Sequence, residues 1–124
     1  AVNKFCLQAV TGKSLTVWKT ALNQKRPYLG LNDAIRSIKF FIEKDIFDNK
    51  IYNILSSNNT VKEILDAIGK DIPKVRYKLV ESEIMNQLSY NVSNNLIKKK
   101  GFVFKDQLVS GIKDTLFLLN NIKN

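Results

Sequence analysis

Apolar residues recur at helical spacing in five stretches of the chain, and each stretch predicts a helix. The first covers residues 1–10 and ends at Gly12, and the second has Asn32 or Asp33 as its N-cap. The third helix begins at Thr60 with a capping box and ends at Gly69. A fourth, short helix follows residue 93, and a fifth helix starts near residue 106. The predicted buried positions are Val2, Phe5, Cys6, Ala9 and Val10; Ala34, Ile35, Ile38, Phe41 and Ile42; Val61, Ile64, Leu65 and Ile68; and Leu108, Val109, Ile112, Leu116 and Leu119.

Four further stretches predict strands. Residues 14–20 and 75–80 alternate apolar and polar side chains, residues 51–55 form a compact strand-like run, and residues 56–59 read as a loop. Pro27 and Gly30 favour a short or edge strand near residues 26–31. Helices and strands therefore alternate, and we expect an α/β fold in which helices cover a small sheet, within one domain spanning residues 1–124.

Composition narrows the classes of function. The 124 residues carry 20 Lys and Arg against 11 Asp and Glu, a net charge of +9 that favours anionic partners. The absence of His excludes Ser-His-Asp catalysis and His-bearing zinc sites. The single Cys6 permits no intrachain disulfide and indicates a cytoplasmic protein. Apolar runs are too short to span a membrane.

The sequence contains no complete motif for binding a nucleotide phosphate. Gly12-Lys13-Ser14 resembles the end of a P-loop, but position 7 is Leu where that motif needs Gly, so Gly12 reads better as a helix C-cap. The five glycines never reach the G-x-G-x-x-G spacing of a dinucleotide site. We therefore predict no catalytic, cofactor-binding or metal-binding residue in this chain.

Basic residues leave two interpretations open. The lysines are scattered, and residues 98–100 form the only run, which argues against nucleic-acid binding. A small basic nucleic-acid-binding or interaction module without enzymatic activity remains the alternative. Arg26 lies between a polar turn and a short strand, where it can bind a phosphate or carboxylate or simply be a surface arginine.

Segments spread along the chain carry a resemblance to a known family. Residues 26–34 read Arg-Pro-Tyr-Leu-Gly-Leu-Asn-Asp-Ala, similar to the family's Arg-aspartate-Tyr-x-x-Val-x-Asp-Ala segment. The helix of residues 5–9 leads to Leu-Thr-Val-Trp at 15–18, Ile-Tyr-Asn-Ile at 51–54 precedes the helix from residue 60, and residues 90–112 match its closing pattern. The chain thus resembles the C-terminal half of extended short-chain dehydrogenase/reductases, the NAD-dependent epimerase/dehydratase enzymes that act mostly on nucleotide-sugars.

This resemblance implies a substrate-binding portion that normally follows a Rossmann domain. In the family the Rossmann half holds NAD or NADP and a Tyr-x-x-x-Lys pair, and none of the four tyrosines here has Lys four residues later. The chain alone should be a fragment-like, inactive part of an isomerase or related enzyme. By the same resemblance Arg26 would contact the substrate diphosphate, and Thr16, Val17 and Trp18 would line the base pocket, largely through backbone groups.

Three departures from the family pattern affect this expectation. Lys19 stands where the family usually has Gly, and Lys100 replaces the usual Leu before Gly101. Residues 81–87 contain two acids and lack the Arg that often binds phosphate in the family. A surface built to meet the Rossmann half would be apolar, so self-association is also expected.

Overall fold

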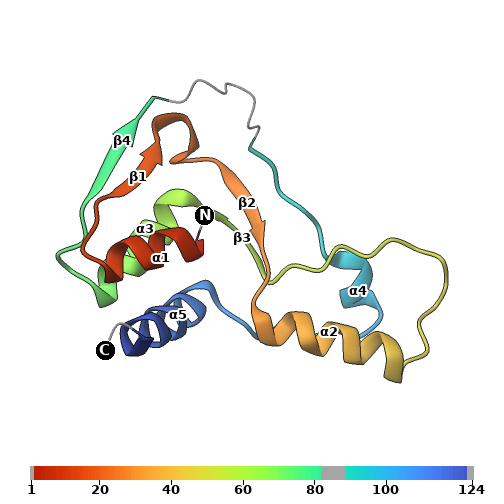
Figure 1. The fold of residues 1–124 in the computed structure, drawn as a ribbon. Coiled ribbons are helices and arrows are strands. Elements are labelled where there is room, and N and C mark those ends of the chain that lie inside the picture. The colour runs from red at the N-terminus through yellow and green to blue at the C-terminus, as the bar shows by residue number, and fades with distance from the viewer. Residues whose placement is uncertain (1, 82–88, 123–124) are drawn as a thin grey trace.

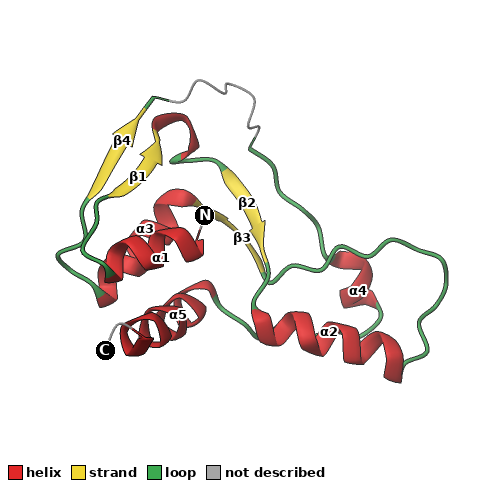
Figure 2. Cartoon of the chain, viewed as in Figure 1, coloured by secondary structure: helices red, strands yellow, loops and turns green. Residues whose placement is uncertain are grey.

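The computed structural model describes residues 2–81 and 89–122, and it is an α/β fold with small sheets and covering helices, as predicted. Figures 1 and 2 show the path of the chain. Its elements are α1 (Val2–Val10), β1 (Leu15–Trp18), the 3-10 turn η1 (Lys19–Ala21), β2 (Lys25–Tyr28), α2 (Leu31–Glu43), β3 (Ser57–Thr60), α3 (Val61–Asp71), β4 (Tyr77–Val80), α4 (Asn95–Lys99) and α5 (Leu108–Ile122). Within the described ranges, no helix is long and apolar enough to cross a membrane.

The four strands form two separate pairs. β1 runs parallel to β4, with Leu15 opposite Tyr77 and Trp18 opposite Val80. β2 runs antiparallel to β3, with Lys25 opposite Thr60. A parallel pair needs a long crossover connection, and here the connection contains β2, α2, β3 and α3.

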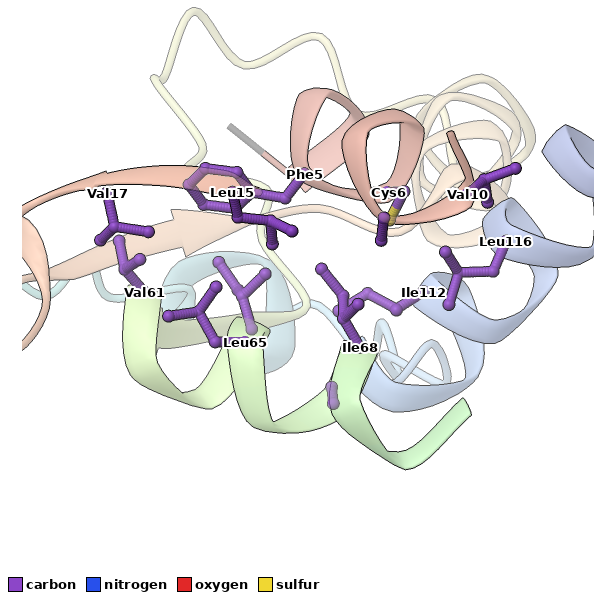
Figure 3. Close-up of a cluster of buried hydrophobic side chains, with 13 residues drawn as sticks. Phe5, Cys6, Val10, Leu15, Val17, Val61, Leu65, Ile68, Ile112 and Leu116 are labelled. Atoms are coloured by element: carbon purple, nitrogen blue, oxygen red, sulfur yellow. The ribbon is translucent and has the colours of Figure 1, made fainter. Parts of the chain in front are cut away.

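The hydrophobic core lies between α1, α3 and α5 and the inner face of β1 (Figure 3). Its largest fully buried apolar side chains are Leu15, Ile64, Ile68, Ile112 and Val17. Each such side chain contributes about 1.5–3 kcal/mol by leaving water. The core therefore fixes β1, and β1 in turn fixes the strand end that carries the predicted base-pocket residues.

The patterns that build this core are confirmed. The stripe of α1 is buried at Phe5, Cys6, Ala9 and Val10, and Gly12 closes the helix with a left-handed φ of 71°. β1 alternates buried and exposed side chains. In α3 the hydroxyl of Thr60 accepts the backbone N–H of Glu63, while the Glu63 carboxylate accepts the N–H of Thr60. Local periodicity was sufficient here because each element buries its face within this chain.

The strand predicted for residues 51–55 is wrong, and so is the loop predicted for residues 56–59. Residues 51–55 are extended but not part of a sheet in the described structure, whereas Ser57–Thr60 form β3. The reason is pairing: polar residues 57–60 find β2 as a neighbour, while the apolar run before them finds no strand beside it among the described residues.

The buried face predicted for α2 is also wrong. Ile35, Ile38 and Ile42 are 58–64% exposed, and the residues of α2 that are buried are Asp33 and Ser37. The helix begins at Leu31 after Gly30, with no side-chain cap from Asn32 or Asp33. α2 therefore uses its polar side to contact this chain and leaves its most apolar side in solvent.

Smaller differences concern element ends and faces. α3 continues through Gly69 to Asp71, and α5 begins at Leu108, not near residue 106. Val109 in α5 is exposed although the sequence predicts it to be buried, and the apolar residues Tyr77 and Leu79 of β4 are exposed as well. Tyr77 and Leu79 lie beside the buried Leu15 and Val17 on the same face of the sheet, but the core cluster includes residues of β1 and none of β4, so this part of the face remains in solvent.

Candidate functional site

The carboxyl ends of the parallel strands β1 and β4 lie side by side, and an ion pair connects the residues that follow them. The ammonium of Lys19, directly after β1, donates to the carboxylate of Glu81, directly after β4. The two residues are 62 positions apart in the sequence, and both side chains are exposed. Lys19 and Glu81 both belong to the departures from the family pattern noted above. Their opposite charges therefore pair with each other.

Arg26 lies on β2 in a partly exposed and well-defined position. Its Nη1 donates to the backbone oxygen of Lys25 at 2.8 Å, and its Nη2 donates to Oε1 of Gln24 at 3.2 Å. Its Cζ lies 5.0 Å from the centre of the Tyr90 ring, a cation–π contact. Burial raises the pKa of the Tyr28 phenol, and the positive charge of Arg26 partly opposes that shift. The guanidinium is thus oriented, as recognition of a planar anionic group requires.

The three predicted base-pocket residues lie together on β1, but only two of their side chains reach the surface. Val17 is 1% exposed and belongs to the core, so its backbone alone can contact a ligand. Thr16 is exposed and its hydroxyl lies 3.5 Å from Nε2 of Gln8. Trp18 is 37% exposed at the end of the strand. One edge of β1 is paired with β4, and in the described part of the chain the other edge has no strand.

Arg26 belongs to the other sheet, and its link to the chain beyond β4 was not foreseen. The hydroxyl of Ser89 accepts the backbone N–H of Lys25 at 3.0 Å, which places Tyr90 against Arg26. The stretch predicted to lack a phosphate-binding Arg lies outside the described residues except for Glu81. The contacts of Tyr90 and of the Lys19–Glu81 pair join distant parts of the sequence, and no local spacing signals them.

The buried carboxylate of Asp33 lies near the start of α2 and connects it to Ser56 and to residues 105–106. Asp33 is fully buried and receives the guanidinium of Arg36 at 2.7 Å, the Ser56 hydroxyl at 2.8 Å, and the backbone N–H groups of Lys105 and Asp106 at 3.0 and 2.9 Å. Burial raises the pKa of the Asp33 carboxyl, but these hydrogen bonds and the Arg36 charge together hold it below the usual range. At neutral pH Asp33 therefore ties three segments together as a carboxylate anion.

A second polar cluster lies at the far end of α2. The Tyr52 hydroxyl donates to Asp48 at 2.8 Å, and the Lys100 ammonium lies 3.2 Å from the same carboxylate oxygen. They adjoin a pocket of about 460 Å³ lined by Phe41 and Phe47 among others. Burial and the Asp48 hydrogen bond raise the pKa of Tyr52. A general acid–base group needs a pKa near neutrality, so this tyrosine is poorly suited to proton transfer.

Among the described residues, no group of three Cys, Asp or Glu side chains could hold a metal ion. Comparison with protein-family models finds no match, and comparison with curated proteins finds none either. Solved structures do match. UDP-glucose 4-epimerase from Thermus thermophilus, solved as its complex with NAD, superposes with a TM-score of 0.77 and 19% identity over 95% of this chain and 39% of that one.

Two further solved structures match as well. An L-threonine dehydrogenase from Cupriavidus necator matches with a TM-score of 0.78 and 20% identity over 94% of this chain and 40% of that one. ADP-L-glycero-D-manno-heptose-6-epimerase from Helicobacter pylori matches with a TM-score of 0.76 and 18% identity over 95% of this chain and 37% of that one. The chain thus spans about two fifths of the length of each structure. It has the fold of the C-terminal part of NAD-dependent epimerases and related dehydrogenases.

Proposed function

We propose that this chain is the substrate-binding part of an NAD(P)-dependent epimerase, dehydratase or reductase acting on nucleotide-sugars. The observation that carries the proposal is the match of 95% of the chain to about two fifths of two nucleotide-sugar epimerases. By this proposal a Rossmann half, in the same or another chain, supplies NAD or NADP and the catalytic groups. The present chain then contributes binding and orientation of the substrate.

The proposed substrate contacts are Arg26 for the diphosphate and Thr16, Val17 and Trp18 for the nucleotide base. Support comes from the oriented, partly exposed guanidinium of Arg26 and from the unpaired edge of β1 within the described structure. Because the Val17 side chain is in the core, its share of the base pocket is confined to backbone groups. The net charge of +9 favours an anionic substrate.

The strand-to-helix turns of this chain do not fit a dinucleotide cofactor. Pyrophosphate binds where a Gly-rich turn leaves helix N–H groups open. At the start of α2 the carboxylate of Asp106 already accepts the N–H of Asp33 at 2.9 Å, and a Cβ added to Gly30 would lie 2.2 Å from that carboxylate. At the start of α3 the capping box of Thr60 and Glu63 fills the same place. We therefore assign NAD(P) to the Rossmann half.

The alternative, a small basic nucleic-acid or interaction module, is not favoured by the structural matches. It makes a distinct prediction, since affinity for a nucleic acid would fall steeply with salt. Because one of the matched structures is an L-threonine dehydrogenase, L-threonine is a useful control ligand in binding experiments.

The test is binding of UDP, ADP and GDP to the complete polypeptide encoded by the reading frame that contains this chain, measured by titration calorimetry. Arg26→Ala should weaken binding of the preferred nucleotide about 10-fold or more, since a hydrogen bond to a charged group contributes about 1.5–3 kcal/mol. Arg76→Ala, which removes the same charge from an exposed position before β4, should change it less than about twofold.

Three outcomes would overturn the proposal. Equal effects of the two arginine variants would remove Arg26 from the binding site. Binding of L-threonine without any nucleotide would replace the nucleotide-sugar by an amino acid. Salt-sensitive binding of RNA or DNA without nucleoside diphosphate binding would favour the basic module.

A further inference from the structure

The ion pair of Lys19 and Glu81 lies directly after the last paired residues of two parallel strands. Trp18 of β1 lies opposite Val80 of β4, so Lys19 and Glu81 are the next residue on each strand. The exposed ion pairs within α2 and α3 join residues four positions apart, whereas this pair joins residues 62 positions apart. Figure 1 shows β1 and β4 ending on the same side of the molecule, where η1 leads on to β2. Ligands of α/β proteins bind outside the carboxyl ends of parallel strands, and this pair lies at such a place.

Both side chains of the pair are accessible to a ligand. Those of Lys19 and Glu81 are 55% and 77% exposed. The Lys19 ammonium donates to Oε1 of Glu81, and among the described residues the two side chains make no other hydrogen bond. The ammonium therefore keeps two further N–H donors, and the carboxylate keeps Oε2 as an acceptor. An exposed ion pair contributes little to stability, so it can exchange its partners for a ligand at small cost.

Trp18 adds a flat aromatic surface next to this pair. Its side chain is 37% exposed at the end of β1 and lies on the same exposed face of the strand as Thr16. Every nucleobase can stack on an aromatic ring, and stacking alone distinguishes poorly between bases. The choice of base must therefore come from polar groups that meet its edge, and Lys19 and Glu81 are the charged groups next to Trp18 in the chain and across the strand pair.

The hydrogen-bonding edge of guanine complements the pair. Guanine presents in a row one acceptor, O6, and two donors, N1–H and the N2 amino group. The Lys19 ammonium is a donor, and the Glu81 carboxylate offers two acceptor oxygens side by side. Three hydrogen bonds can form, each with a charged partner, and no acceptor meets an acceptor.

The other bases complement the pair less well. Adenine and cytosine each offer one amino group to the carboxylate and one ring nitrogen to the ammonium, so two hydrogen bonds can form. Uracil can offer O4 to the ammonium and N3–H to the carboxylate, but its O2 then faces the second carboxylate oxygen. Such a contact between two acceptors opposes binding, and the pair therefore favours guanine over uracil most strongly.

We propose that Lys19 and Glu81 recognise the base of the nucleotide-sugar and that this base is guanine, stacked on Trp18. The inference rests on the proposed function and narrows its substrate class to GDP-sugars. The diphosphate extends from the end of β1 toward Arg26, which lies on β2 directly beyond η1. Lys19 and Glu81 act here as specificity residues, because they contact the base and not the reacting sugar.

Titration calorimetry of the complete polypeptide with GDP, IDP, ADP and UDP tests this assignment. IDP is GDP without the N2 amino group and so lacks one contact with Glu81. GDP should bind about 10-fold or more tightly than each of the other three, because the lost hydrogen bonds involve a charged group. Glu81→Gln should reduce the ratio of the GDP and IDP affinities to about twofold or less, because an amide has one acceptor oxygen in place of two.

The matched control is Asp66→Asn, which removes the carboxylate of the exposed pair in α3. It should leave the ratio of the GDP and IDP affinities unchanged. Because both changes lie on exposed side chains, both variants are expected to fold.

Equal affinities of the unchanged polypeptide for GDP and IDP would overturn the assignment of guanine. So would a ratio that survives Glu81→Gln, or one that falls as much in Asp66→Asn. Binding of UDP or ADP in preference to GDP, weakened by Arg26→Ala, refutes the guanine assignment and leaves the proposed function standing. Failure of every nucleoside diphosphate to bind refutes the proposed function and the guanine assignment together.

Discussion

Replacing Asp33 by Asn removes one negative charge from a side chain that is fully buried and holds together the start of α2, Ser56 and residues 105–106. The carboxylate accepts hydrogen bonds at both oxygens from the Arg36 guanidinium, the Ser56 hydroxyl and two backbone N–H groups. An amide has only one acceptor oxygen, and its NH₂ group would face donors. Asn therefore keeps the size of the side chain while leaving about half of these donors without an acceptor.

The expected loss follows from the contacts. A hydrogen bond to a charged group contributes about 1.5–3 kcal/mol, and breaking a buried ion pair costs about 3–5 kcal/mol. We expect Asp33→Asn to lower the free energy of unfolding by about 3–5 kcal/mol, and Tm by about 10 °C or more. The assay is urea and thermal denaturation followed by circular dichroism.

The matched control is Asp66→Asn in α3. Asp66 is 61% exposed and pairs with Lys62 one helical turn earlier, so its replacement should cost only a few tenths of a kcal/mol. A loss below about 1 kcal/mol for Asp33→Asn would refute the reasoning. It would mean that the four hydrogen bonds contribute little beyond what water offers in the unfolded chain.

The dependence of stability on pH tests the same carboxylate. Its pKa in the folded chain lies below that of an unfolded Asp, which is about 4. Its contribution is therefore complete above about pH 4 and is lost as the pH falls through the lower, folded pKa. The wild-type chain should lose stability on acidification more steeply than Asp33→Asn, and parallel acid limbs would contradict this.

Three more substitutions and one chemical probe test other features. Gly30→Ala should destabilise by about 1–3 kcal/mol in urea denaturation because its Cβ would meet Asp106, whereas Gly111→Ala, with open space in α5, should stabilise by about 0.5–1 kcal/mol. Thr60→Ala should cost about 1 kcal/mol by thermal denaturation, since it removes the capping box of α3. Burial raises the pKa of the Cys6 thiol, so at pH 8 a thiol reagent should modify it about 100-fold more slowly in the folded chain than in guanidinium; equal rates would place Cys6 outside the core.

Sequence patterns sufficed to predict an element and its buried face where that face packs inside this chain. The stripes of α1 and α3 and the alternation of β1 are confirmed for this reason. The same reasoning failed for α2 and for residues 51–55, whose apolar patterns imply burial but do not say against what. A periodic pattern reports that a face needs a partner, and the partner can lie outside the chain.

The candidate site shows a similar division. The sequence places Thr16, Val17 and Trp18 on one strand, and its alternation puts the apolar Val17 on the face of β1 that the core buries. The contacts of Arg26 with Tyr90, and of Lys19 with Glu81, depend on the crossover between sheets. Such pairs are set by topology, which spacing along the chain does not encode.

The parallel pairing of Leu15 with Tyr77 has a consequence for synthesis on the ribosome. Translation at about 5–20 residues per second leaves β1 waiting roughly 3–12 s before β4 has been made. During most of that interval α1 is the one core helix of the described chain that has been made, because α3 follows only shortly before β4 and α5 is made after it. This part of the nascent chain therefore depends on early folding of α1, and slowing translation between β1 and α3 should increase its need for chaperones.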